Sequence, residues 1–251
     1  MFASLPMYDR PSTRAGYAQL WVGIRDNLRD VGIDAPEALD YDTAEMAGWR
    51  RDDLVLGQIC NLPYRAIFQG KVTRIGAADY GLDGCEAGFY RSVLIAHKEN
   101  AAEIEALAKG PFAANGLGSH SGYGSPQAWA KERGFLFPSP ILTGSHDRSL
   151  QSVAAKQAAI ASIDAQTWVH QQRDMPEAKD VRVVAWTKPS PGMTFITKGD
   201  VNPVPYQDAI AAAIANLSAD MRGVLGLKGV IALPDEAYAL PMPPLPSQID
   251  A

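Results

Sequence analysis

Short apolar runs alternate with amphipathic, helix-like segments along most of this chain. The first pair is an apolar run at residues 2–7, followed by apolar side chains at three- and four-residue steps from Tyr17 to Val31, which end at Gly32. This alternation predicts an α/β fold in which mostly parallel sheets are flanked by helices. In such sheets, ligands bind beyond the carboxyl ends of the strands.

The alternation also predicts two lobes, because it restarts after Lys98 and the chain returns near Lys188. We expect residues 1–97 and 188–251 to form the first lobe, with residues 98–187 inserted as the second. A ligand cleft between the lobes and a hinge at the two crossing segments follow from this layout. The proline-rich tail from Pro234 has no period, which predicts an extended strap or a frayed end. The other expected strands cover residues 53–60, 72–77, 89–97, 111–114, 141–142, 159–163, 181–186 and 194–198, and the other expected helices cover 62–68, 101–108, 125–133, 147–157, 164–172 and 206–217.

Composition restricts the partners. The chain has 251 residues, of which 47% are hydrophobic and 20% charged, as in an ordinary globular protein. A net charge of -5 argues against nucleic acid and anionic membranes, so an anion would have to be held by local donors. The first residues lack the basic and apolar parts of an export signal. We therefore expect a monomer that is periplasmic if a signal was removed, and cytoplasmic otherwise.

The residues with most chemical potential form a glycine- and serine-rich turn at 116–123, Gly-Leu-Gly-Ser-His-Ser-Gly-Tyr, which is called the Gly–Ser turn below. It stands between an expected strand and an expected helix, where backbone N–H groups lack intrahelical partners and the helix dipole favours negative charge. Ser119 and Ser121 add hydroxyl donors, so the turn suits phosphate, phosphonate or a similar oxyanion. The alternative is an ordinary helix cap with glycines for the turn.

Two further polar residues open helices after strands: His146 and Asp164. With Ser121 they would make a Ser–His–Asp hydrolase conceivable, but the G-x-S-x-G spacing of a nucleophile elbow is missing. No phosphate-binding P-loop or dinucleotide fingerprint is present. The polar groups suit holding an anion better than breaking a bond, so we expect no catalytic residues, no cofactor and no metal.

Two cysteines, Cys60 and Cys85, are too few for a metal cage and lack CxxC spacing. From the residues alone they are either two separate thiols or one structural disulfide, which would need an oxidising compartment.

Several short motifs together resemble the phosphate/phosphite/phosphonate-binding proteins of ABC importers, over residues 5–227. The resemblance implies the type II periplasmic-binding-protein fold and a small oxyanion ligand, and it allows for an ABC permease as partner. The motifs are Ser119–Gly122, Gly144–His146, Ala161–Asp164, Gly57-Gln58 followed by Pro63-Tyr64, and Phe89–Val93.

The resemblance also implies roles for single residues. The turn of Ser119, His120, Ser121 and Gly122 would wrap the phosphonate oxygens, although His120 stands where the family usually has a small residue or threonine. The remaining ligand contacts would be His146 to another oxygen, Tyr90 closing on the ligand, and Asp164 to an amine or a protonated oxygen. Close relatives carry paired cysteines, which implies a disulfide between Cys60 and Cys85.

We also expect Tyr64 or Tyr8, both at strand ends, to line the cleft from the first lobe. The function predicted is therefore a solute-binding protein that is not an enzyme. Two alternatives use the same scaffold: an enzyme acting on a phosphorylated metabolite, with His120 or His146 as proton shuttle, and a cytoplasmic sensor domain.

Overall fold

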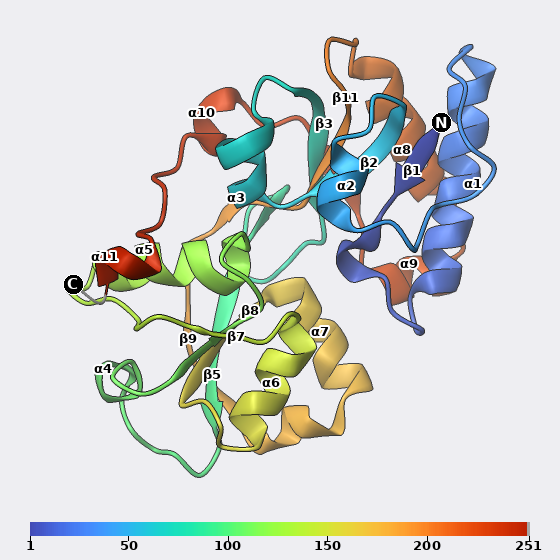
Figure 1. Ribbon diagram of the computed structural model, residues 1–251. Helices are drawn as coiled ribbons and strands as arrows, with labels where there is room; N and C mark the ends of the chain where they lie inside the picture. Colours follow the sequence, from blue (N-terminus) through green and yellow to red (C-terminus); the bar gives the residue numbers. More distant parts are fainter. Residues whose placement is uncertain (250–251) are drawn as a thin grey trace. The chain divides into compact units, whose positions relative to one another are not determined.

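The computed structural model describes residues 1–249 of the chain and divides into two compact units (Figure 1). The first contains Met1–Phe89 and Pro191–Tyr238, and the second contains Tyr90–Ser190 with the C-terminal segment from Ala239. The chain passes between the units within β4 (Phe89–Tyr90) and β10 (Ser190–Pro191), which pair as a two-stranded sheet, and again after α10 (Asp235–Tyr238). This division differs from the one drawn from the sequence, because residues 90–97 and 188–190 and the C-terminal segment from Ala239 lie in the second unit.

The first unit is built on a five-stranded sheet in the order β1-β2-β11-β3-β12. Only β1 and β2 pair in parallel, whereas β11 runs antiparallel to both of its neighbours and β12 antiparallel to β3. The strands are β1 (Phe2–Ser4), β2 (Leu54–Ile59), β3 (Val72–Asp79), β11 (Thr194–Lys198) and β12 (Gly229–Ile231).

The long helix α1 (Arg14–Asp30) packs against α8 (Val204–Asn216) in the first unit (Figure 1). Its buried side chains recur at three- and four-residue steps, as the sequence predicts. At this contact a Cβ on Gly23 would lie 3.0 Å from the Ala213 Cβ, so small residues let the two helices approach closely. The shorter helices are η1 (Pro6–Tyr8), α2 (Glu45–Trp49), α3 (Asn61–Pro63), η2 (Tyr64–Phe68) and α9 (Ala219–Leu225).

The second unit has a five-stranded sheet in the order β7-β6-β8-β5-β9. The first three strands are parallel, and β5 is antiparallel to β8 and β9, so the carboxyl ends of β6 and β8 share an edge with the amino end of β5. The strands are β5 (Ser92–His97), β6 (Phe112–Ala114), β7 (Ile141–Leu142), β8 (Ile160–Asp164) and β9 (Val181–Trp186).

Alternate residues of β5 face two different cores. Leu94 packs in a cluster with Phe112 and Tyr123, whereas Val93 and Ile95 pack in a cluster on the other face of the sheet. Both faces are therefore covered, as an apolar central strand requires. The helical elements are α4 (Ile104–Leu107), η3 (His120–Gly124), α5 (Ser125–Lys131), α6 (His146–Ala154), α7 (Ala165–Asp174) and η4 (Pro176–Asp180).

The predicted α/β class is confirmed, with mixed sheets in both units. The sheets are mixed because β11 and β5 run against their neighbours, a direction that an apolar run in the sequence does not encode.

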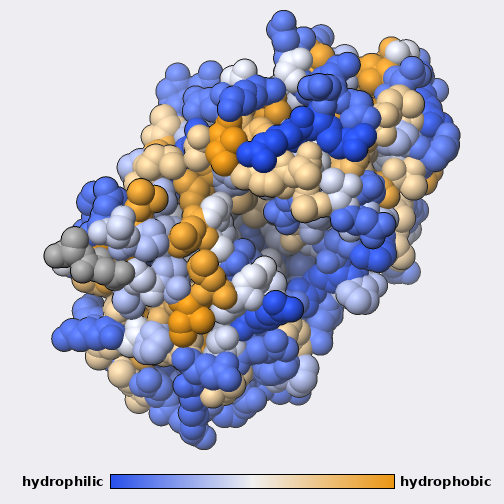
Figure 2. Space-filling model, in the orientation of Figure 1, coloured by the Kyte–Doolittle hydropathy of each residue, from blue (hydrophilic) through white to orange (hydrophobic). Residues whose placement is uncertain are grey.

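Among residues 1–249, no helix has the length and apolar character needed to span a bilayer. Figure 2 shows hydrophilic residues over most of the visible surface, with a narrow hydrophobic band in the region of β7, where Ile141 and Leu142 are exposed.

The described part of the C-terminal segment is a strap held to the second unit. The Tyr123 hydroxyl donates to the Pro244 carbonyl over 2.7 Å, and Ile249, in α11 (Pro246–Ile249), packs against the cluster that contains Tyr123. Of the two sequence-based alternatives, strap or frayed end, the structure has the strap.

The predicted disulfide is wrong, because Cys60 and Cys85 are not bridged. Cys60 follows β2 and Cys85 follows β3, and β11 lies between these strands. The strand order that separates the two residues depends on a strand more than 100 residues further along the chain.

Candidate functional site

The Gly–Ser turn begins beyond the carboxyl end of β6 and contains one turn of π-helix, η3. Ser119 caps it: its Oγ accepts a hydrogen bond from Gly122 N at 3.0 Å, and its carbonyl accepts from Gly124 N, five residues on, at 3.0 Å. All five residues of η3 are buried. Single π-turns of this kind are frequent at functional sites. The turn is thus a helix cap, and it also places N–H and hydroxyl donors in one spot.

Gly122 is the glycine of the turn at which a side chain would displace a neighbour. A Cβ there would lie 1.9 Å from Asn115 Oδ1 and 3.1 Å from Ser119 Oγ. By contrast, a Cβ on Gly116 or Gly118 would meet nothing within 4 Å. Asn115 therefore lies directly beside the start of η3. The sequence does not identify Asn115 as a site residue, because its position just after a strand is the only feature that points to it.

Ser121 joins the turn to two other elements. Its Oγ lies 3.0 Å from Nε2 of His146, the first residue of α6, and its carbonyl accepts from Ser162 Oγ of β8 at 2.6 Å. Ser145 caps α6 by accepting from Arg148 N at 3.2 Å, which fixes the place of His146 at the helix start. The structure thus brings Ser119, Ser121, Gly122 and His146 together. It adds Ser162, which sequence analysis named only as part of a motif.

Burial lowers the pKa of His146 to about 4, and the nearby Asp147 carboxylate offsets part of that effect. The imidazole is therefore neutral at pH 7, with one ring nitrogen that donates and one that accepts. A group with this pKa is a poor general base at neutral pH, since efficient bases titrate near the working pH. The Ser121–His146 pair consequently has the geometry of a Ser–His dyad without an effective base.

The His120 side chain is turned toward the strands that cross between the units. Its Nε2 lies 2.9 Å from Ser190 Oγ, and its ring centroid is 6.1 Å from that of Tyr90. Ser190 and Tyr90 belong to β10 and β4, which pair. Ser190 was missed because a serine between two prolines carries no periodic signal.

Asp164, the last residue of β8, caps α7 by accepting from Thr167 N at 2.9 Å, and its side chain is buried. This is the cap role that the sequence analysis offers beside the ligand contact. The contact with a ligand stays a prediction.

The two tyrosines of the first unit lie in aromatic clusters. Tyr8 packs edge-on against Tyr80 at 5.1 Å, and Tyr64 packs against Tyr238 at 5.5 Å between ring centroids. At the carboxyl end of β2, Gln58 Oε1 is buried and has no hydrogen-bond partner among residues 1–249. Contacts of Tyr8 and Tyr64 with a ligand stay predictions.

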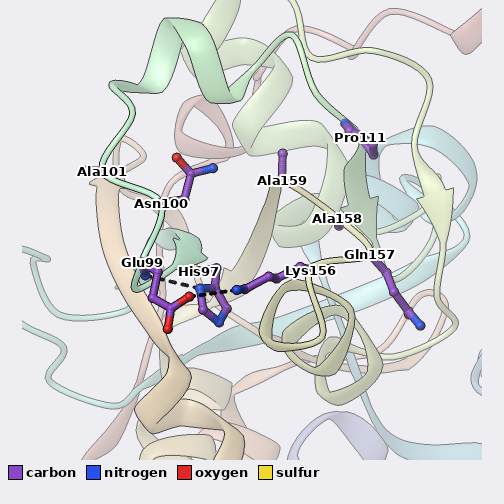
Figure 3. A pocket seen from close by; sticks show the side chains of 9 residues that line it. All are labelled: His97, Glu99, Asn100, Ala101, Pro111, Lys156, Gln157, Ala158 and Ala159. Atoms are coloured by element: carbon purple, nitrogen blue, oxygen red, sulfur yellow. Dashed lines mark hydrogen bonds and ion pairs between the residues drawn. The ribbon is translucent and has the colours of Figure 1, made fainter.

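The second unit also has a surface pocket of about 510 Å3 at the opposite edge of its sheet (Figure 3). Its charged groups compensate one another: Lys156 Nζ lies 2.7 Å from Glu99 Oε2, and the Glu99 N–H donates to His97 Nδ1 over 3.2 Å. The lining residues are His97, Glu99, Asn100, Ala101, Pro111, Lys156, Gln157, Ala158 and Ala159. Pro111 and Ala159 precede β6 and β8, so this pocket is separate from the Gly–Ser turn.

The sequence matches, over residues 2–238, the family described as "ABC transporter, phosphonate, periplasmic substrate-binding protein". The chain belongs to this family of phosphonate-binding proteins. The resemblance drawn from the motifs is thereby confirmed. The family consists of substrate-binding proteins of transporters rather than enzymes. The comparison with curated proteins found no match in sequence.

Solved structures of similar fold include two phosphonate-binding proteins. PhnD1 from Prochlorococcus marinus in complex with methylphosphonate is 16% identical, with a TM-score of 0.70 over 95% of this chain and 94% of that one. A binding protein component of an ABC phosphonate transporter from Pseudomonas aeruginosa is 18% identical, with a TM-score of 0.66 over 94% and 82%. XAC2383 from Xanthomonas citri bound to chloride ion is 16% identical, with a TM-score of 0.68 over 94% and 92%. These likenesses confirm the type II periplasmic-binding-protein fold of this phosphonate-binding family member.

Proposed function

We propose that this phosphonate-binding family member captures a small oxyanion, a phosphonate or phosphate, at the Gly–Ser turn. The observation that carries the proposal is the convergence of Ser121 Oγ and His146 Nε2, 3.0 Å apart, at the start of η3, beside the capping Ser119. Family membership and the methylphosphonate complex of the similar PhnD1 support the ligand class.

The proposed site holds an anion through neutral groups. Ser119 Oγ accepts from Gly122 N, and its own hydrogen can go to Ser121 Oγ, 3.5 Å away, or to a ligand oxygen. The N–H groups of the first turn of η3 add donors and the positive end of a helix dipole. Hydrogen bonds to a charged group contribute about 1.5–3 kcal/mol each, so a few of them suffice for micromolar binding.

The finer assignments belong to the same proposal. Tyr90, Asp164 and one of Tyr8 and Tyr64 would contact the ligand, as the family resemblance implies. The protein would act as a monomer in the periplasm and deliver the ligand to an ABC permease. A cleft between the units, and hinge closure over the ligand, stay predictions.

The decisive test is Ser121→Ala, measured by calorimetry with methylphosphonate. We expect binding to weaken about ten- to a hundredfold, since one hydrogen bond to a charged oxygen is lost and each 1.4 kcal/mol is tenfold. Ser152→Ala is the matched control, because that serine, on α6, donates to the Arg148 carbonyl and lies away from the turn. If Ser121→Ala binds like the wild type, the turn is only a helix cap and the proposal fails.

The Ser121–His146 hydrogen bond also favours a second candidate, a hydrolytic enzyme using this pair. The lowered pKa of His146 argues against it, because an imidazole of pKa about 4 removes a serine proton poorly at pH 7. Turnover of an activated ester that is abolished by His146→Gln would favour the enzyme instead.

A further inference from the structure

Asn115 presents a buried polar atom whose hydrogen-bonding capacity is unused. Its Oδ1 is shielded from solvent and accepts no hydrogen bond from any residue in the described range 1–249. Buried polar atoms in proteins usually have a partner, because an unsatisfied one costs about 1–3 kcal/mol. An unsatisfied acceptor therefore calls for an explanation.

The position of this atom links it to the anion site. A Cβ placed on Gly122 would lie 1.9 Å from Asn115 Oδ1 and 3.1 Å from Ser119 Oγ, so these two side-chain oxygens lie near one another. Gly122 N, at the same place, donates to Ser119 Oγ. An oxyanion held by the Ser119 hydroxyl would thus lie within reach of the Asn115 carboxamide. Earlier in the turn there is free space, since a Cβ on Gly116 or Gly118 would meet nothing within 4 Å.

We propose that Asn115 is a specificity-determining residue of this site, whose carboxamide oxygen accepts a hydrogen bond from a protonated oxygen of the bound anion. The inference rests on the proposed function. Phosphate and a phosphonate monoanion carry a P–OH group at neutral pH, whereas sulfate carries only acceptor oxygens. A carbonyl oxygen facing an acceptor oxygen would repel it, because neither has a hydrogen to share. The site would then favour phosphate and phosphonate over sulfate.

An amide has two ends, and the opposite orientation would present the NH₂ group to the anion. Two substitutions separate these arrangements. Asn115→Leu keeps the branch at Cγ and has no polar side-chain atoms, so it removes either interaction. Asn115→Asp keeps acceptor oxygens and removes the NH₂ donor, so it preserves the first arrangement only.

The experiment is calorimetry at pH 7 with phosphate, methylphosphonate and sulfate on the wild type and both variants, with thermal unfolding to verify folding. In Asn115→Leu, phosphate and methylphosphonate should bind about tenfold more weakly, with sulfate unchanged, so that the preference for P–OH ligands shrinks. In Asn115→Asp, that preference should remain or increase.

Two results would overturn the assignment: an unchanged ratio of phosphate to sulfate affinity in Asn115→Leu, or a reduced ratio in Asn115→Asp. A wild-type protein that binds none of the three anions would overturn the proposed function, and this inference with it. If the wild type binds these anions and Asn115→Leu has the same ratio of phosphate to sulfate affinity, only the role of Asn115 is overturned.

Discussion

Replacing Gly122 by alanine tests the close packing at the Gly–Ser turn. The added methyl group would lie 1.9 Å from Asn115 Oδ1, so the Asn115 side chain must rotate away, and 3.1 Å from Ser119 Oγ, which must yield by a few tenths of an ångström. Overpacking of this kind costs about 1–3 kcal/mol. Because the main obstacle is the end of a side chain with two torsions, we expect the lower end of that range, a fall of a few degrees in the melting temperature.

Ligand binding should suffer more than stability. The methyl group and the displaced carboxamide would occupy the space beside the Ser119 hydroxyl, and the loss of one or two hydrogen bonds to an anion corresponds to at least tenfold weaker binding. Calorimetry with methylphosphonate and thermal unfolding should be run in parallel on Gly122→Ala and Gly118→Ala.

Gly118→Ala is the control, because its Cβ would meet nothing within 4 Å and its backbone is outside the left-handed region. It should bind and unfold like the wild type. Equal affinities and melting temperatures for the two alanine variants would refute the close packing of Asn115, Ser119 and residue 122 described above.

Two further outcomes follow from the structure. Between pH 6.5 and about 4 the unfolded chain binds a proton at His146 that the folded protein excludes, so stability falls as the pH is lowered through this window. The melting temperature of His146→Gln should therefore fall less than that of the wild type between pH 7 and 4.5. Melting temperatures that fall equally in both proteins would contradict the lowered pKa. Since Cys60 and Cys85 are not bridged, thiol titration in denaturant without reductant should find two thiols per chain. If the titration finds no thiols, the two cysteines form a disulfide after all.

Elements whose signal is local could be predicted from the sequence. The periodic apolar face of α1 and the apolar runs of β9 and β11 have nearly the predicted bounds, because each pattern reports burial within one segment. Residues 89–97 were expected as one strand, but Arg91 separates β4 from β5. Those two strands have different partners far away in the sequence, which an apolar run does not reveal.

The same distinction applies to the site. Helix starts at His120 and His146 follow from local turn chemistry, and parallel strands place them at one edge of the sheet. The contact of His120 with Ser190 depends on the return strand β10, whose two residues have no pattern of their own. The separation of the two cysteines likewise depends on β11, which enters the sheet from the far end of the chain.

The pairing of β4 with β10 has a consequence for recombination between relatives. Residues 90–190 leave and re-enter the first unit through adjacent strands, so two cuts at neighbouring points excise the whole insertion, including the proposed anion site, as a cassette. The C-terminal strap complicates such an exchange, because the Pro244 carbonyl accepts from Tyr123 inside the cassette. A chimera that moves ligand preference from one family member to another must therefore carry its own C-terminal strap, and needs three joints instead of two.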